Sequence, residues 1–121
     1  MSTPFFSSVM PSLPVADMDR AITFYTKSLG FILSFRNGSS FAIVTRDAIQ
    51  LGLMTPEVAG VPAGHGRCYC KLSGGIDAVY SDYCSRSVSI RHELRDESYG
   101  MREFMIADPD QNEVNFGQPI P

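Results

Sequence analysis

The sequence predicts an α+β fold made of two βαβββ units that follow one another in a single domain over residues 1–121. The order of strand, helix and three further strands is expected in residues 8–54 and again in residues 67–118. A Gly- and Pro-rich linker at residues 55–66 separates the two units. Since neither unit can cover its own sheet, we expect a curved mixed sheet shared by both, with the helices on its outer side.

The closing β-hairpin is the clearest element of the sequence. Its turn is Asp-Pro-Asp at residues 108–110, in which proline presets φ and aspartate bonds the backbone ahead of it. Extended runs lie on both sides, at residues 101–107 and 113–117. Phe104 and Ile106 share one face of the first run, because side chains alternate along a strand.

In the first unit, apolar residues at helical spacing predict a helix over residues 18–29. Asp17 is its expected N-cap, and Gly30 its expected C-terminal stop. The pair Asn37-Gly38 predicts a hairpin between two of the strands. The strands expected in this unit cover residues 9–15, 31–36, 41–45 and 48–54.

The second unit repeats this order, and related positions recur at a nearly constant separation. Val15 and Leu72 lie 72 − 15 = 57 residues apart, and Tyr25 and Tyr83 lie 83 − 25 = 58 residues apart. Apolar residues at helical spacing, beginning at Ile76, predict the second helix. Strands are expected at residues 67–72 and 88–94, followed by the closing hairpin.

The composition excludes several classes of function. A net charge of −3 argues against binding to nucleic acid, which requires a basic face. No window reaches the roughly 18 apolar residues that a membrane span needs, and the N-terminal segment lacks the basic region of a secretion signal. Three cysteines without a Cys-x-x-Cys pair indicate reduced thiols, so we expect a cytoplasmic protein.

Three motifs, in this order and spacing, are typical of one superfamily. They are Leu-Pro-Val-Ala-Asp at residues 13–17, the helix that ends in Leu-Gly-Phe at residues 29–31, and residues 99–112, which read YGMREFMIADPDQN. With them the chain resembles the vicinal oxygen chelate superfamily of glyoxalases, ring-cleaving dioxygenases and bleomycin resistance proteins. The resemblance implies a glyoxalase/bleomycin resistance-like fold and a ligand held on the inner face of the sheet.

The enzymes of that superfamily hold a divalent metal through His or Glu at inward strand positions. The resemblance places Met10, Arg67 and Asn115 at three of these positions, and Gln50 or Gly52 at the fourth. A thioether, a guanidinium and an amide are poor ligands for a hard divalent ion. We therefore expect no metal site and no cofactor.

An alternative function stays open at this point. A glyoxalase- or dioxygenase-like metalloenzyme is conceivable if His65, His92 or Glu113 supplies relocated ligands. No nucleophile stands beside a credible base in the sequence, so the enzyme hypothesis depends on the superfamily alone. We expect binding without catalysis.

The resemblance is greatest to the metal-free bleomycin resistance proteins. It implies a homodimer whose interface clefts sequester a cationic antibiotic, with the units paired within one chain or exchanged between two. Gln111 stands where that family has Gly and a positive φ is needed. Tyr69 is the remaining aromatic residue beside Cys68 and Cys70, where the family has an aromatic pair. The ligand-binding residues that we expect are Phe41, Arg67, Tyr69, Tyr99, Arg102 and Asn115, with Phe41 and Tyr99 as aromatic walls and an ion pair as the alternative role for Arg102.

Overall fold

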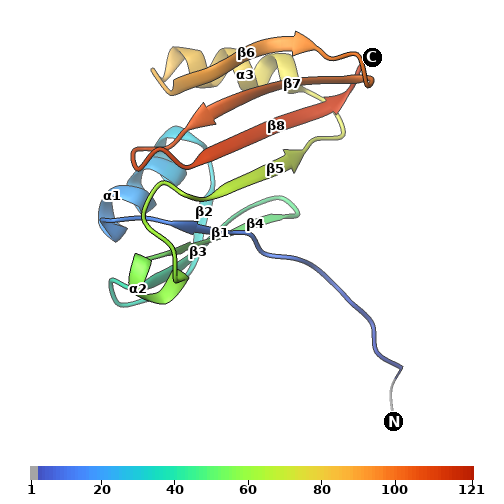
Figure 1. Ribbon diagram of the computed structural model, residues 1–121. Helices are drawn as coiled ribbons and strands as arrows, with labels where there is room; N and C mark the ends of the chain where they lie inside the picture. Colours follow the sequence, from blue (N-terminus) through green and yellow to red (C-terminus); the bar gives the residue numbers. More distant parts are fainter. Residues whose placement is uncertain (1–2) are drawn as a thin grey trace.

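A computed structural model describes residues 3–121 and contains two βαβββ units in succession (Figure 1). The first unit consists of β1 (Ser12–Pro14), α1 (Met18–Thr23), the π-helix η1 (Phe24–Ser28), β2 (Ile32–Asn37), β3 (Phe41–Arg46) and β4 (Ile49–Met54). The second consists of β5 (Arg67–Lys71), α3 (Ile76–Ser85), β6 (Ser89–Asp96), β7 (Met101–Ala107) and β8 (Glu113–Pro119). The predicted α+β class with a repeated βαβββ order is confirmed.

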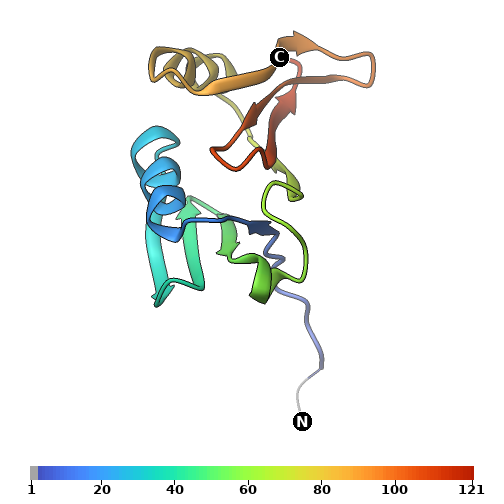
Figure 2. The same ribbon diagram turned by 60° about the vertical axis from the view of Figure 1, so that its left-hand side comes forward.

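Each unit carries its own four-stranded mixed sheet, and the two sheets have the same topology. Their strand orders are β1-β4-β3-β2 and β5-β8-β7-β6. The first strand of each unit pairs in parallel with the last, and the remaining pairs are antiparallel. Figure 2 shows the second unit above the first, joined by a single connecting segment.

Side-chain alternation decides which face of each sheet is buried. In β3, Ala42 and Val44 are fully buried, whereas Phe41 and Ile43 point to the other side and are half-exposed. The buried faces meet the helices, since α1 packs against β3 and β4, and α3 packs against β6, β7 and β8. Each aliphatic side chain buried in this way contributes about 1.5–3 kcal/mol. Within the described part of the chain, a short helix, α2 (Pro56–Ala59), contacts β1 and β4 of the first sheet, and the opposite face of each sheet is otherwise without a helix.

The helix predicted over residues 18–29 is present but changes its winding. α1 ends at Thr23, and η1 continues the helix with an i→i+5 bond from the Leu29 amide to the Phe24 carbonyl (3.2 Å). The Thr26 hydroxyl donates to the Ile22 carbonyl at 2.8 Å, a local bond that competes with the regular ladder. Gly30, with φ of 77°, ends the helix as predicted.

Two boundaries differ from the sequence prediction. β1 spans only three residues, because prolines at both ends limit the backbone donors that a longer strand would need. The segment 55–66 contains a short helix, α2 (Pro56–Ala59), which the prediction of a linker missed. Proline at its first position and Gly60 in the left-handed conformation after it are the signals that identify it.

The seam between the units is polar on the side of the β7–β8 turn, where Asp108 is the most heavily bonded carboxylate and Oδ2 of Asp110 is buried without a partner in residues 3–121. Buried Asp108 accepts from the Tyr25 hydroxyl and the Asn112 amide (both 2.9 Å) and from two backbone amides of its own turn. Asn112 also donates to the Pro14 carbonyl at 2.8 Å. The turn takes its positive φ at Gln111 (75°), the position where a glycine would be expected.

A second tyrosine crosses the seam in the opposite direction. The Tyr83 hydroxyl on α3 donates to the Leu29 carbonyl at 2.7 Å, as the Tyr25 hydroxyl of the first unit reaches Asp108 of the second. Burial raises the pKa of both phenols, that of Tyr83 to about 12. These two equivalent residues therefore hold the units together from both sides.

Candidate functional site

The candidate site lies on the face of the second sheet that α3 does not cover. Val114 and Phe116 of β8 point toward α3 and are buried, so Glu113 and Asn115 point the other way. The same alternation places side chains of β5 and β7 on this side. We call this surface the open face of the second unit; it is formed by Arg67, Tyr69, Glu103, Glu113 and Asn115, with Tyr99 from the β6–β7 turn.

A carboxylate held between two phenols is the central feature of the open face. The Tyr69 hydroxyl donates to Oε2 of Glu103 at 2.6 Å, and the Tyr99 hydroxyl donates to Oε1. The bond to Glu103 raises the pKa of Tyr99 to about 12, and burial together with the same carboxylate raises the pKa of Tyr69. Both phenols are therefore neutral donors at physiological pH. Both rings remain accessible, with exposed fractions of 45% for Tyr69 and 66% for Tyr99.

Gly117 makes the contact between Tyr69 and Glu103 geometrically feasible. Tyr69 lies on β5 and Glu103 on β7, so the phenol has to cross β8, which runs between them. A Cβ at position 117 would overlap the Tyr69 hydroxyl oxygen. The glycine is thus required by the ring that lies above it.

Arg67 occupies the edge of the same face without being buried. Its Nε lies 3.9 Å from Oε1 of Glu113, while Oε2 of that carboxylate accepts from Arg91 at 2.8 Å. Two guanidinium groups therefore share one carboxylate. The Arg67 side chain is 66% exposed, so it is the more available of the two. Asn115 lies in register with Tyr69.

Phe41 lies on the uncovered face of the first sheet, next to a second aromatic ring. Its centroid is 6.0 Å from that of Phe35, which is 51% exposed. On the same sheet, Met10 and Met54 place their methyl groups within 3.3 Å of the site where a Cβ on Gly52 would lie. This part of the first sheet is therefore apolar, including Met10.

Arg102 lies apart from these residues, on the α3 side of β7. It bonds Asp96 at 2.7 Å and Asp77 of α3 at 3.2 Å. These ion pairs connect β6, β7 and α3, the alternative role considered for it from the sequence. Ligand binding by Arg102 remains a prediction, and it would require this network to open.

Residues 3–121 contain no group of three or more His, Cys, Asp and Glu side chains arranged to hold a metal ion. Of the relocated ligands considered, His92 is exposed on β6 and His65 lies in the connecting segment. Glu113 is already engaged by the two arginines. In this same described part, no helix is long and apolar enough to cross a bilayer.

Three residues of the site were not identified from the sequence as ligand-binding residues. Glu103 is the strand neighbour of buried Phe104, so the sequence pattern predicted only that it points to the face opposite Phe104. Nothing in the sequence showed that two tyrosines would converge on it, since they come from β5 and a turn thirty residues later. For Gly117 and Phe35, the sequence predicted a position in a strand and gave no indication of a role in ligand binding.

Comparison with known proteins agrees with the fold. The sequence matches the Glyoxalase/Bleomycin resistance protein/Dioxygenase superfamily over residues 7–116, and the chain belongs to that superfamily. A bleomycin resistance protein of Geobacillus stearothermophilus is 28% identical, over 92% of this chain and 96% of that protein.

Two solved structures are similar over nearly the whole chain. TnmS3, an antibiotic-binding protein from Streptomyces sp. CB03234, has a TM-score of 0.83 and 26% identity, with 98% of this chain and 100% of that chain covered. The bleomycin-binding protein of Streptomyces verticillus, solved with copper(II)-bleomycin, has a TM-score of 0.78 and 25% identity, with 94% and 97% covered.

Proposed function

We propose that this protein binds a small antibiotic of the bleomycin type and sequesters it without catalysis, in a cleft between two copies of the chain in the cytoplasm. The observation that carries the proposal is the pair of exposed tyrosines bonded to Glu103 on the open face of the second unit. Flat heteroaromatic groups stack on such rings, and a carboxylate beside them attracts a cationic group. Relatives that bind bleomycin or another antibiotic support this ligand class.

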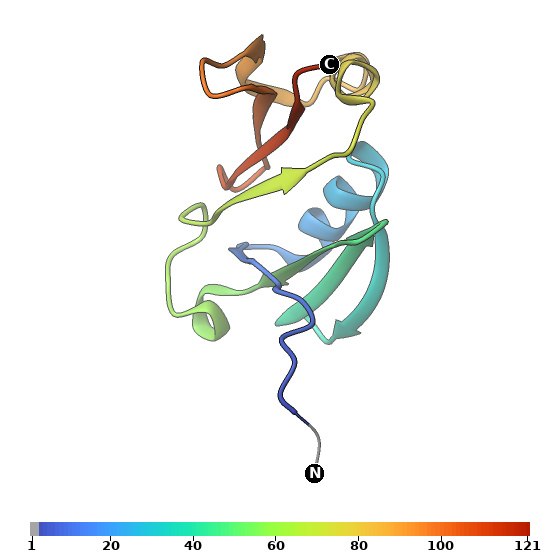
Figure 3. The ribbon, with the colours of Figure 1, turned by 90° about the vertical axis from the view of Figure 1, so that its right-hand side faces the viewer.

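Two further features support a dimer. The N-terminal arm, residues 3–11, meets the first sheet at its end, where Met10 and Pro11 contact Gly52, and its first part extends away from the rest of the chain (Figure 3). Phe5, Phe6 and Val9 on this arm are 87%, 96% and 82% exposed, which is costly for large apolar side chains unless another surface covers them. The uncovered faces of both sheets, with Phe35 and Phe41 on the first, offer such a surface. A second copy would cover the arm and close the cleft at once.

Titration with bleomycin tests the ligand. Tyrosine fluorescence reports binding because the chain has no Trp. We expect quenching that saturates at one ligand per chain, and a Kd raised about tenfold in Tyr69→Ala and in Tyr99→Ala, since each ring contributes stacking of roughly 0.5–1.5 kcal/mol together with buried area. Val58→Ala, on the surface of α2, is the matched control and should leave the Kd unchanged.

Two results would contradict this function. Absence of saturation up to millimolar bleomycin would reject the drug. Stoichiometric Ni, Fe, Mn or Zn in protein purified without chelator would favour the metalloenzyme alternative instead. Sedimentation equilibrium of the full chain and of a chain lacking residues 3–11 tests the dimer separately, with a shift toward monomer expected after truncation.

A further inference from the structure

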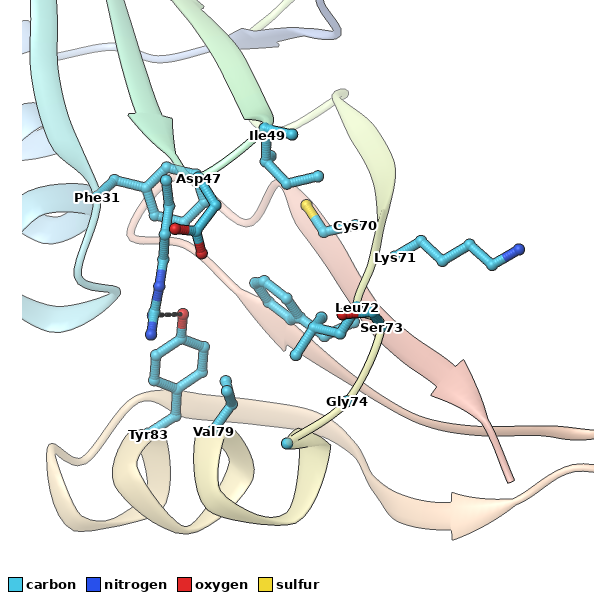
Figure 4. A pocket seen from close by; sticks show the side chains of 14 residues that line it. Phe31, Asp47, Ile49, Cys70, Lys71, Leu72, Ser73, Gly74, Val79 and Tyr83 are labelled. Atoms are coloured by element: carbon cyan, nitrogen blue, oxygen red, sulfur yellow. Dashed lines mark hydrogen bonds between the residues drawn. The ribbon is translucent and has the colours of Figure 1, made fainter. Parts of the chain in front are cut away.

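A hollow lies at the seam between the two units, on the opposite side of β5 from the open face (Figure 4). Cys70 lines it, whereas its neighbour Tyr69 points to the open face. The hollow has a volume of about 410 Å³, within the range of small-molecule sites. It is therefore separate from the proposed antibiotic cleft.

The walls of this hollow, which we call the seam pocket, come from both units. Tyr83 and Val79 point into it from α3, and Phe31 faces them from the first unit (Figure 4). The ring of Phe116 lies 5.5 Å from that of Tyr83, centroid to centroid. Three aromatic rings of this kind suit the flat apolar body of a ligand. The remaining wall residues used below are Arg46, Asp47, Ala48, Lys71 and Gly74.

Arg46 lines the pocket without an ion-pair partner in residues 3–121. Its Nη1 donates to the Leu29 carbonyl (2.8 Å) and to the Tyr83 hydroxyl (3.2 Å), which are both neutral acceptors. Seven of the eight arginines in the sequence lie within 4.0 Å of a carboxylate oxygen; within residues 3–121 Arg46 does not. Its Nε and Nη2 donate to no group in that same range, so two parallel donors are free.

Two other charged side chains line the seam pocket. Asp47 is exposed to solvent and its carboxylate lies on the side of the hollow, beside Phe31 (Figure 4), but it forms no ion pair with Arg46 within 4.0 Å. Lys71 is exposed too, and its side chain points away from the hollow (Figure 4). The wall therefore combines apolar rings with one guanidinium and the solvent-exposed carboxylate of Asp47.

We propose that the seam pocket binds a small aromatic carboxylate. The ring system lies against Phe31, Tyr83 and Phe116, and the carboxylate accepts two parallel hydrogen bonds from Nε and Nη2 of Arg46. Guanidinium and carboxylate match in this bidentate geometry, which gives charge-assisted bonds about twice as strong as neutral ones. Binding would thus supply Arg46 with the anionic partner that the seven other arginines have within the chain.

Amide chemical shifts in a titration with naphthalene-2-carboxylate test this site. We expect saturable shifts at Asp47, Ala48 and Gly74, with a Kd about tenfold lower than for the neutral naphthalene-2-carboxamide. Shifts confined to Tyr69, Tyr99 and Glu103, equal affinity for acid and amide, or no saturation would each overturn the proposal. Bleomycin binding is assigned to the open face by its dependence on Tyr69 and Tyr99, so the two proposals fail independently.

Two variants sharpen the test. Gly74→Phe places a ring at the mouth, where an added Cβ meets no atom within 4 Å, and should abolish binding without lowering the melting temperature. Arg46→Met keeps an apolar stem and leaves the Leu29 carbonyl bonded to Tyr83, so it should remove the preference for the acid while the amide still binds. Val58→Phe on α2 is the control for an added surface ring. Unimpaired binding by Gly74→Phe would place the ligand elsewhere.

Discussion

At the scale of single residues, Glu103 decides the chemistry of the open face. It orients two phenols that come from different elements, and it keeps both of them protonated. A carboxylate that accepts from two tyrosines still has free lone pairs, so it can also bind a cationic group while both tyrosine hydrogen bonds are kept. Gly117 is part of the same arrangement, because any larger residue displaces Tyr69.

Replacing Glu103 by Gln should lower the pKa of Tyr99 from about 12 toward its ordinary value near 10, and the pKa of Tyr69 should fall in the same direction. The negative charge that opposes formation of the phenolate is removed, whereas the amide oxygen still accepts a hydrogen bond. Alkaline titration of tyrosinate absorbance measures the shift. Glu57→Gln on α2 is the control, and an unchanged titration in Glu103→Gln would contradict the proposed role of the carboxylate.

At the scale of elements, the end of α3 has a residue that is unfavourable for its backbone conformation. α3 is followed by Arg86 and then by Ser87, whose φ is +59°. This left-handed position after a helix is normally taken by glycine, since a Cβ is strained there. The chain tolerates the strain because the Val88 amide still bonds the Tyr83 carbonyl at 3.1 Å.

Ser87→Gly should therefore stabilise the protein by about 0.5–1 kcal/mol, through relief of strain at a backbone geometry that is already formed. Ser85→Gly, two residues earlier and inside α3, should destabilise it by about the same amount because glycine is a poor helix former. Urea unfolding of both variants measures the two effects. Equal effects of the same sign would show that φ at position 87 is not the cause.

At the scale of the whole molecule, the buried carboxylate of Asp108 joins the two units. Burial raises its pKa above the ordinary value, although the bonds from Asn112 and Tyr25 oppose the shift. A carboxyl group with a raised pKa binds its proton more readily in the folded than in the unfolded state. Its contribution to stability is therefore present below the unfolded pKa of about 3.9 and is lost as the pH rises through the folded value.

Asp108→Asn should remove this part of the pH dependence. The difference in free energy of unfolding between Asp108→Asn and the parent chain should grow in favour of the variant as the pH rises from about 4 toward neutrality. Urea midpoints at a series of pH values measure it. Asp17→Asn, an exposed carboxyl group, is the control, and a difference independent of pH would contradict the assignment to Asp108.

The sequence predicted the order of the elements because alternation and helical spacing are local signals. The positive φ of Gln111 was expected from the resemblance to the superfamily, which has Gly at that position, and not from these local signals. Contacts between distant segments did not follow from them. Tyr69, Tyr99 and Glu103 meet only because β5, β8 and β7 lie side by side, and the pairing of Arg102 with Asp77 depends on where α3 packs. The seam pocket is likewise a product of packing between units, for which no single segment carries a pattern.

The crossing tyrosines make the two units depend on each other. Tyr25 donates to a carboxylate of the second unit, and Tyr83 donates to a backbone carbonyl of the first. A polypeptide cut in the connecting segment would, on separation, lose both acceptors and expose two large buried rings to water. We therefore expect neither half to be stable as a separate chain.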